Sequence, residues 1–347
     1  MEVRDYAFAR KVLTAGDIGF ADAYIAGHWD TPNLSAVLEF FSLNAEEIMR
    51  LLRGNWLAQA ANMLAHIRRD NNREGARRNI HEHYDLGNRF YEAWLDPTMT
   101  YSSACFEPGD DLTAGQINKY RALADKLQLK PGEHILEIGC GWGGFAEVAA
   151  RDYGARVTGL TISNEQHSYA RERMARAGLS DSVDIKLLDY RDADGAYDKI
   201  ASIEMFEAVG ERYWSDYFAK VSSLLKPGGR AAFQIITIKD DLFAAYRLRA
   251  DFIQRYIFPG GMLPSLARLK EEATHAGLAW EPVHRFGEHY ADTLAAWGQR
   301  FTAHWEVIRG LGFDERFKRL WRFYLSYCEA GFRTARTDVV QVALAKA

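Results

Sequence analysis

Residues 135–150 read ILEIGCGWGGFAEVAA. A short apolar run leads into four closely spaced glycines, and apolar residues at helical spacing follow them. Glycines between a strand and a helix let a ligand approach the backbone, and the start of the helix offers unpaired N–H groups. The spacing is G-x-G-x-G, whereas dinucleotide-binding loops have G-x-G-x-x-G. The stretch therefore predicts a ligand-binding turn, with a purely structural tight turn as the alternative.

The segments around this turn alternate between strand-like and helical patterns. Beyond the strand that opens the turn, we expect strands within 155–163, 181–190, 197–203 and 226–238, and helices within 117–129, 144–153, 163–179 and 213–225. Such alternation is typical of an α/β fold with a mostly parallel, doubly wound sheet. The remainder, 240–347, is rich in helical patterns and aromatic residues, and it ends in the strand-like run DVVQVALAKA.

Composition narrows the class of protein. A formal charge of −4 over 347 residues favours a globular protein that does not bind nucleic acid. The three cysteines, Cys105, Cys140 and Cys328, have neither metal-ligand spacing nor the number that a disulfide framework needs, so we expect no metal site. We recognise no secretion signal and no run of ~18 apolar residues, which predicts a cytoplasmic protein. An aromatic content of 13% fits either an aromatic core or an aromatic-lined cavity.

The chain divides into three expected segments. Residues 1–66 have apolar residues at helical spacing and predict a small helical domain, which is the candidate for a homodimer or membrane contact. A basic linker at 67–82 follows, and 83–347 contain the glycine turn. The five arginines of the linker fit a solvated connection. They equally fit contact with lipid phosphates, because basic groups near an anionic membrane gain about 1 kcal/mol each.

Two carboxylates stand at the end of the expected fourth strand. Residues 197–210 read YDKIASIEMFEAVG, so that Glu204 and Glu207 directly follow an apolar run. Open α/β sheets bind ligands at the carboxyl ends of their strands. We therefore expect both carboxylates in a ligand site, with the alternative that Glu204 faces solvent or pairs with an arginine such as Arg247.

Glu137, two residues before the first glycine, completes an E-x-G-x-G-x-G pattern that resembles motif I of the class I methyltransferases. A carboxylate at a strand end suits a cationic ligand, and S-adenosylmethionine has both an ammonium and a sulfonium group. Most members of that class have an acid at the end of the second strand for the ribose hydroxyls. Here that strand ends in GLTIS, without an acid. This absence narrows the choice of family within the class I methyltransferases.

More of the chain resembles the cyclopropane fatty acid synthase family. The matching stretches are HYDLGNRFYEAWLDPTMTYSSACF (83–106), EIGCGWGGFAEVAA (137–150), GLTISNEQ (159–166), DYRD (189–192), MFEAVG (205–210), RYIFPGGMLPS (255–265) and CEAGFRTARTDVVQV (328–342). The resemblance implies a Rossmann-like class I methyltransferase domain. The stretch GDIGFADAYIAGHWD also resembles the smaller N-terminal domain of members that act on phospholipids.

The resemblance implies S-adenosylmethionine as the cofactor. Carried over by position, its contacts are Tyr101, Ser102, Glu137, Gly139, Gly141, Gly143, Thr161, Ile162, Gln166, Asp189 and Tyr190.

The resemblance also implies a base, which in the family is a bound bicarbonate held by Cys, Glu, His and Tyr side chains and a backbone amide. Glu207 and Tyr290 match that set, whereas Ser103 and Gln234 stand at the Cys and His positions. Glu204 stands where the family usually has glycine, and Ala208 replaces the usual His. Our hypothesis is that Glu204 supplies the carboxylate itself, with the other four residues orienting it, so that bound bicarbonate is disfavoured.

The activity implied is methylation of the double bond of an unsaturated acyl chain in a phospholipid, by a cytoplasmic enzyme at the inner membrane face. The base decides between a cyclopropane and a methyl or methylene branch. Two alternatives are a small-molecule methyltransferase on the same scaffold and a non-catalytic lipid-binding subunit. The expected acyl-binding residues are Tyr84, Phe206, Phe252, Tyr256, Phe258, Tyr324 and Cys328.

Overall fold

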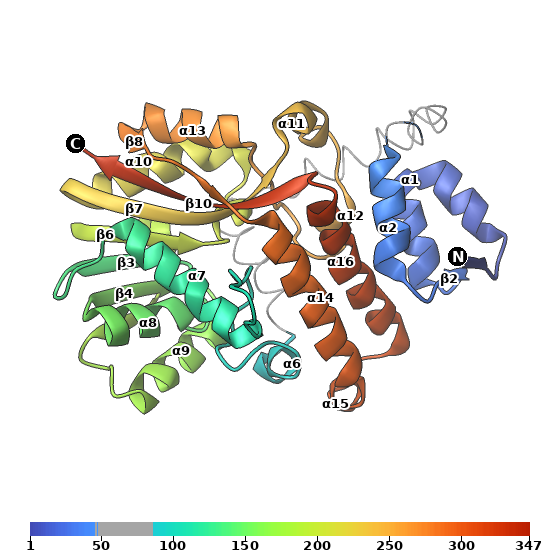
Figure 1. Ribbon diagram of the computed structural model, residues 1–347, viewed down its shortest axis with the longest axis horizontal. Coiled ribbons are helices and arrows are strands. Elements are labelled where there is room, and N and C mark those ends of the chain that lie inside the picture. The colour runs from blue at the N-terminus through green and yellow to red at the C-terminus, as the bar shows by residue number, and fades with distance from the viewer. Residues whose placement is uncertain (46, 48–85) are drawn as a thin grey trace.

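The computed structural model describes residues 1–45, 47 and 86–347 (Figure 1). The basic linker expected at 67–82 lies outside the described residues, as do Tyr84 and the part of the expected helical domain from 48 to 66. The boundaries expected between the three segments therefore stay predictions.

A sheet of eight strands dominates one end of the described chain, in the order β5-β4-β3-β6-β7-β10-β8, with β9 also paired to β10 (Figure 1). The parallel strands are β3 (His134–Ile138), β4 (Arg156–Thr161), β5 (Val183–Leu187), β6 (Tyr197–Ile203) and β7 (Leu225–Ile238). The antiparallel strands are β8 (Leu278–Trp280), β9 (His284–Arg285) and β10 (Thr337–Lys346). The expected α/β fold with a mostly parallel sheet is confirmed.

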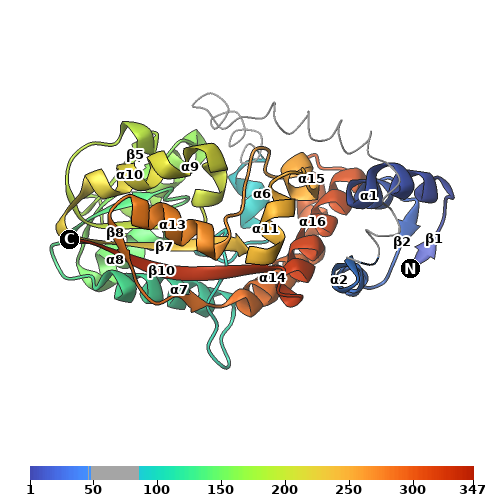
Figure 2. The same ribbon diagram turned by 90° about the horizontal axis from the view of Figure 1, so that it is seen from above.

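Helices cover both faces of this sheet, and Figure 2 shows α7 and α8 on the side opposite α10 and α13. One apolar core joins the sheet to α7 (Leu112–Leu127), α8 (Gly144–Tyr153) and α9 (Asn164–Arg176). The other core joins it to α10 (Trp214–Leu224) and α13 (Leu266–His275). Because both faces are covered, the inner strands are largely apolar, which explains the apolar runs in the sequence. The edge strand β5 alternates instead, with Asp184 and Lys186 exposed.

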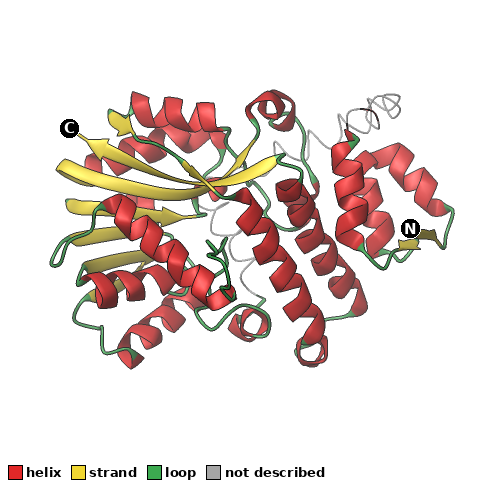
Figure 3. Cartoon of the chain, in the orientation of Figure 1, coloured by secondary structure: helices red, strands yellow, loops and turns green. Residues whose placement is uncertain are grey.

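Helices make up most of the other end of the molecule, which also holds two short strands near the N-terminus (Figure 3). They include the long helices α14 (Gly287–Ala303) and α16 (Glu315–Arg333), with α15 (Trp305–Gly310) between them and α6 (Asn88–Glu92), α11 (Asp240–Tyr246) and α12 (Phe252–Tyr256) nearby. The N-terminal helices α1 (Ala7–Ile25) and α2 (Leu34–Leu43) pack against α16. Many aromatic side chains fill the core between these helices, which accounts for part of the aromatic content.

Arg319 on α16 makes several polar contacts with the N-terminal segment. Its guanidinium donates to the carbonyl oxygens of Tyr24 and Trp29 at 2.5 and 2.8 Å, and it pairs with Asp30 at 3.1 Å. Asp30 belongs to β2 (Trp29–Asp30), which pairs with β1 (Glu2–Val3); the sequence pattern gave no sign of this small sheet. The helical character expected of the N-terminal segment is otherwise found in residues 1–45.

Within the described ranges, no helix has the length and apolar character needed to cross a bilayer. Nor does that part of the chain bring three or more His, Cys, Asp or Glu side chains together in a way that could hold a metal ion.

Candidate active site

A cavity of about 1140 Å³ opens at the carboxyl ends of the parallel strands and continues between α16 and the N-terminal helices. The glycine turn after β3 lines one end, and Phe323 and Phe41 line the other. Ligand sites usually measure about 300 to 1,000 Å³. This cavity is therefore large enough for a cofactor and a second, elongated ligand.

The glycine turn has the geometry that its sequence predicts. Gly139 has a φ of 81°, and a Cβ there would lie 2.6 Å from Cγ of Met205, so no other residue fits without displacing the neighbouring loop. The N–H groups of Gly139 and Cys140 donate to the carbonyl oxygen of Leu160 at 3.0 and 2.8 Å. The turn is thus fixed to the end of β4, and its inner surface lines the cavity.

Glu137 lies beside this turn with one carboxylate oxygen, Oε2, that has no hydrogen-bond partner among the described residues. The side chain is only 2% exposed, and burial raises its pKa to about 8, against the opposing charges of Arg173 and Lys119. A buried, unpartnered carboxylate oxygen is costly unless a ligand satisfies it. The site therefore fits a ligand that brings hydroxyl or ammonium donors, as S-adenosylmethionine does.

The other expected cofactor residues come together around the same end of the cavity. Thr161 donates from Oγ1 to Oε1 of Gln166 at 2.8 Å, and Ser163 caps α9 just beyond the strand. Asp189 pairs with Arg191 at 3.2 Å, and the guanidinium of Arg191 lies 5.2 Å from the centre of the Tyr190 ring. The lining residues from the expected set are Tyr101, Ser102, Glu137, Gly139, Gly141, Thr161, Ile162, Gln166, Asp189 and Tyr190.

Gly143 does not line the cavity, contrary to our expectation. It is the N-cap residue of α8 with a φ of 84°, and a Cβ there would meet the side chains of Met174 and Ala170 on α9. Its place in the motif therefore reflects helix packing and not contact with a ligand.

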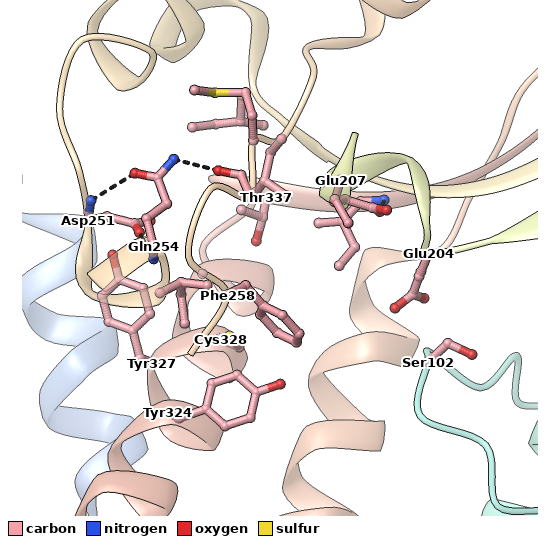
Figure 4. A pocket seen from close by; sticks show the side chains of 18 of the residues that line it. Ser102, Glu204, Glu207, Asp251, Gln254, Phe258, Tyr324, Tyr327, Cys328 and Thr337 are labelled. Carbon is pink, nitrogen blue, oxygen red and sulfur yellow. Dashed lines mark hydrogen bonds between the residues drawn. The ribbon is translucent and has the colours of Figure 1, made fainter. Parts of the chain in front are cut away.

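Glu204 lines the cavity (Figure 4). It is the centre of a hydrogen-bonded cluster. Its Oε2 accepts from the hydroxyl of Tyr290 at 2.6 Å, and its Oε1 accepts from Nε2 of Gln234 at 2.7 Å and from the backbone N–H of Ser103 at 2.9 Å. Burial raises the pKa of Glu204, while Lys119 and these donors act in the opposite direction.

Two alternatives for this cluster are corrected by the geometry. Glu204 neither faces bulk solvent nor pairs with Arg247, which forms an ion pair with Glu211 at 2.7 Å. The hydroxyl of Ser103 does not contact Glu204, because it donates to the carbonyl oxygen of Ala104 at 2.9 Å. Ser103 contributes backbone groups: its N–H donates to Glu204, and its carbonyl oxygen accepts from Nε2 of Gln234 at 3.3 Å. Any residue at that position except proline would supply both groups.

Glu207 lies near Glu204 on the cavity wall (Figure 4). Its Oε1 accepts from the backbone N–H of Ile236 at 2.5 Å, and its buried Oε2 has no partner among the described residues. Burial raises its pKa to about 8, and the charge of Glu204 adds to that shift. The expected proximity of the two carboxylates is therefore found, and each charge disfavours ionisation of the other.

Three of the expected acyl-binding residues line the cavity, namely Phe258, Tyr324 and Cys328 (Figure 4). Burial raises the pKa of the Cys328 thiol, so this residue is an apolar packing group and not a thiolate. Tyr324 shares a hydrogen bond of 2.7 Å with Tyr101, which links the acyl end of the cavity to the cofactor end.

The other three described residues of that set do not line the cavity. Phe206 packs against Trp214, Tyr217 and Phe218 on the far side of its loop, because the 3₁₀ turn η2 (Phe206–Ala208) directs it away from Glu204. Phe252 is fully buried in the helical core. The hydroxyl of Tyr256 donates to Asp22 of α1, which holds the N-terminal helices in place.

Sequence reasoning missed Lys119, which lies wholly buried on α7 with its Nζ 2.5 Å from Oγ of Ser102. The sequence does contain a signal for this buried lysine. Gln116, Lys119, Leu123 and Leu127 follow one another at spacings of three and four, so the lysine lies on the buried face of its helix.

The fold and the cofactor end of the cavity define a class I, S-adenosylmethionine-dependent methyltransferase. Residues 71–342 match the model of the mycolic acid cyclopropane synthetase family. The chain belongs to this family, which confirms the expected resemblance and shows that the protein is an enzyme.

Individual relatives agree with that assignment. The chain is 42% identical to the tuberculostearic acid methyltransferase of Mycobacterium tuberculosis, over 97% of this chain and 81% of that protein. It is 37% identical to the cyclopropane-fatty-acyl-phospholipid synthase of Escherichia coli, over 100% of this chain and 87% of that protein. Among solved structures, a mycolic acid cyclopropane synthase complexed with SAH and CTAB superimposes with a TM-score of 0.73 at 32% identity, covering 78% of this chain and 98% of that one.

Proposed function

We propose that this protein methylates the double bond of an unsaturated fatty acyl chain esterified in a phospholipid, with Glu204 as its internal base. The observation that supports this most directly is the Glu204 carboxylate, held by three donors in a cavity that joins the cofactor turn to an apolar channel. Bicarbonate is not needed at such a site, because the protein provides the carboxylate.

The shape of the cavity favours a lipid over a small polar substrate. Beyond the cofactor end, its walls include Val12 and Phe41 from the N-terminal helices and Phe323 and Tyr327 from α16. Charged groups, among them Arg249, line it where α1 meets the loop before α12. A phospholipid has both an apolar chain and a charged head group, and the cavity offers walls of both kinds. We infer that the enzyme works at the cytoplasmic face of the membrane, where it reaches this substrate.

The residues of the cluster suit the chemistry of an alkene. When bound, S-adenosylmethionine supplies an electrophilic methyl group. The π electrons of the alkene form the new C–C bond, the C–S bond breaks with its electron pair going to sulfur, and the second alkene carbon becomes cationic. Aromatic faces such as those of Tyr101 and Phe258 stabilise a nearby cation. The Glu204 carboxylate then takes one proton, which balances the reaction.

The product depends on which proton Glu204 reaches. Loss of a proton from the new methyl group closes a cyclopropane, whereas loss from a neighbouring chain carbon leaves a branched, unsaturated chain. The relative named as a tuberculostearic acid methyltransferase favours the branched product.

Product analysis tests this proposal. The enzyme is incubated with S-adenosylmethionine and vesicles of a defined monounsaturated phospholipid, and the released acyl chains are identified by gas chromatography with fragmentation of derivatives. A cyclopropane and a methylene branch both add CH₂, so retention time and fragments must distinguish them. Modified acyl chains support the proposal, and methylation confined to soluble acceptors would refute it.

Glu204→Gln tests the base. We expect loss of turnover by at least about 100-fold, the usual contribution of a general base, with cofactor affinity nearly intact. Glu211→Gln, which changes the exposed partner of Arg247, is the matched control and should remain active. Full activity of Glu204→Gln, or a rate in degassed buffer that rises on addition of bicarbonate, would contradict an internal base.

A further inference from the structure

Lys119 is a buried charge that the proposed reaction does not yet use. It lies in the middle of α7 with none of its surface exposed, and its Nζ is 4.5 Å from the centre of the Tyr120 ring. Its hydrogen bond is to the hydroxyl oxygen of Ser102, a neutral group. Burying an ammonium without a nearby negative charge costs several kcal/mol. A stable fold with Lys119 in this place therefore implies a negative charge close by.

The segment Ser102–Ser103 connects this ammonium to the proposed base. Ser102 accepts from Nζ of Lys119 through its side chain, and the next residue, Ser103, donates its backbone N–H to Oε1 of Glu204. The Coulomb interaction with Glu204 is the largest of those that stabilise the charged form of Lys119. Glu204 is thus the main one of several nearby carboxylates, Asp96 and Glu137 among them, that stabilise the buried ammonium.

A second connection runs through the sheet. Gln341 on β10 lies directly opposite Gln234 on β7, and its Nε2 is 3.1 Å from both Oε1 of Gln234 and the backbone carbonyl oxygen of Lys119. Gln234 therefore turns its own Nε2 toward Glu204. Through Gln341 and Gln234, a chain of hydrogen bonds therefore links the backbone of α7 at Lys119 to the Glu204 carboxylate.

We infer that Lys119 is a positioning residue for the reaction: its buried ammonium keeps the Glu204 carboxylate ionised and in place before methyl transfer. The inference rests on the proposed function, because it gives Glu204 the role of base. Lys119 itself does not contact the acyl chain, since it does not line the cavity.

The charges around the pair agree with this role. Burial lowers the pKa of Lys119 to about 7, and burial raises that of Glu204, with Lys119 as the first of the groups that oppose the rise. Removing the ammonium therefore raises the pKa of Glu204 further. The titratable groups that face the pair from the surrounding elements are Asp96, Cys105, Tyr120, Glu137, Glu207 and Tyr290.

Lys119→Met tests the inference, because methionine has nearly the same length and no charge. A base with a raised pKa is protonated over a wider pH range, so the acid limb of the kcat profile should move to higher pH. We expect a shift of about one unit or more, which corresponds to about a tenfold loss of kcat on the acid side and recovery at high pH. The KM for S-adenosylmethionine should change little.

Gln116→Met is the matched control. Gln116 lies one turn before Lys119 and donates to the backbone carbonyl oxygen of Ser102 at 2.9 Å, so it holds the same segment without a charge. We expect this variant to leave the acid limb where it is in the wild type. Equal shifts in both variants would show that Lys119 only supports the segment, and would overturn the inference.

An infrared readout keeps the test independent of turnover and folding yield. The C=O stretch of a protonated Glu204 is identified by its absence in Glu204→Gln, and in Lys119→Met it should persist to higher pH than in the wild type. An unmoved titration overturns the role of Lys119 and leaves the base proposal intact. An active Glu204→Gln enzyme overturns the base proposal instead, so the two failures are distinguishable.

Discussion

Glu204 has a φ of 49°, a left-handed conformation that costs a non-glycine residue about 1 to 2 kcal/mol. Three hydrogen bonds to its carboxylate hold it there. In the family pattern that the sequence resembles, this position is glycine, so the backbone conformation is of the kind that glycine adopts freely. The fold therefore imposes a left-handed backbone conformation at position 204. This conformation directs the Glu204 side chain into the centre of the site.

Glu137 gives a prediction at the same scale. Burial raises its pKa to about 8, so the carboxyl is protonated below that pH, while a cationic or hydroxyl-bearing ligand binds the ionised form. Affinity for S-adenosylmethionine should therefore rise as pH increases toward about 8 and then level off, and binding at neutral pH should release protons. Calorimetry in buffers of different ionisation enthalpy measures this. Glu137→Gln should bind weakly and without that pH dependence, and a flat profile in the wild type would contradict the assignment.

At the scale of elements, one side chain of α16 makes several of the polar contacts with the N-terminal segment, beside the apolar packing of α1 and α2. Arg319 donates to two backbone carbonyl oxygens, pairs with Asp30 and lies 4.0 Å from the centre of the Tyr24 ring. Arg319→Met would leave these acceptors without their donor in a partly buried place.

We expect Arg319→Met to lower the free energy of unfolding by about 2 to 4 kcal/mol, the usual cost of removing a buried, charged hydrogen-bond partner. Thermal and denaturant unfolding measure the change. The control is Arg316→Met, an exposed arginine on the same helix, for which we expect a change within about 0.5 kcal/mol. Equal stability of the two variants would mean that the N-terminal helices are held by apolar packing alone.

At the scale of the whole molecule, the N-terminal helices and the methyltransferase domain share one cavity. Phe41 of α2 lines this cavity, and its ring centre lies 4.8 Å from that of Phe20. Its neighbour Phe40 is 60% exposed and does not line the cavity. The smaller domain is thus a wall of the proposed acyl channel, in addition to any membrane or dimer contact that it makes.

Narrowing the proposed acyl channel at Phe41 tests whether the N-terminal helices contact the substrate. Phe41→Trp should reduce kcat/KM for phospholipid vesicles by about tenfold or more, because overpacking a filled site costs about 1 to 3 kcal/mol. Cofactor affinity, measured by calorimetry, should stay the same. Phe40→Trp is the matched control and should behave like the wild type. Equal kinetics for both variants would place the acyl chain outside this part of the cavity.

The sequence by itself determined the alternation of strands and helices, the glycine turn, the family and the two carboxylates at the end of β6, because each of these depends on local spacing along the chain. Tertiary structure decided which side chains reach the cavity. Phe206 turns into the core between the sheet and α10, Gly143 faces α9, Lys119 carries its charge inward, and the N-terminal helices close one wall. Those outcomes depend on packing between segments far apart in the sequence, and a linear pattern does not contain the direction in which a side chain is finally turned.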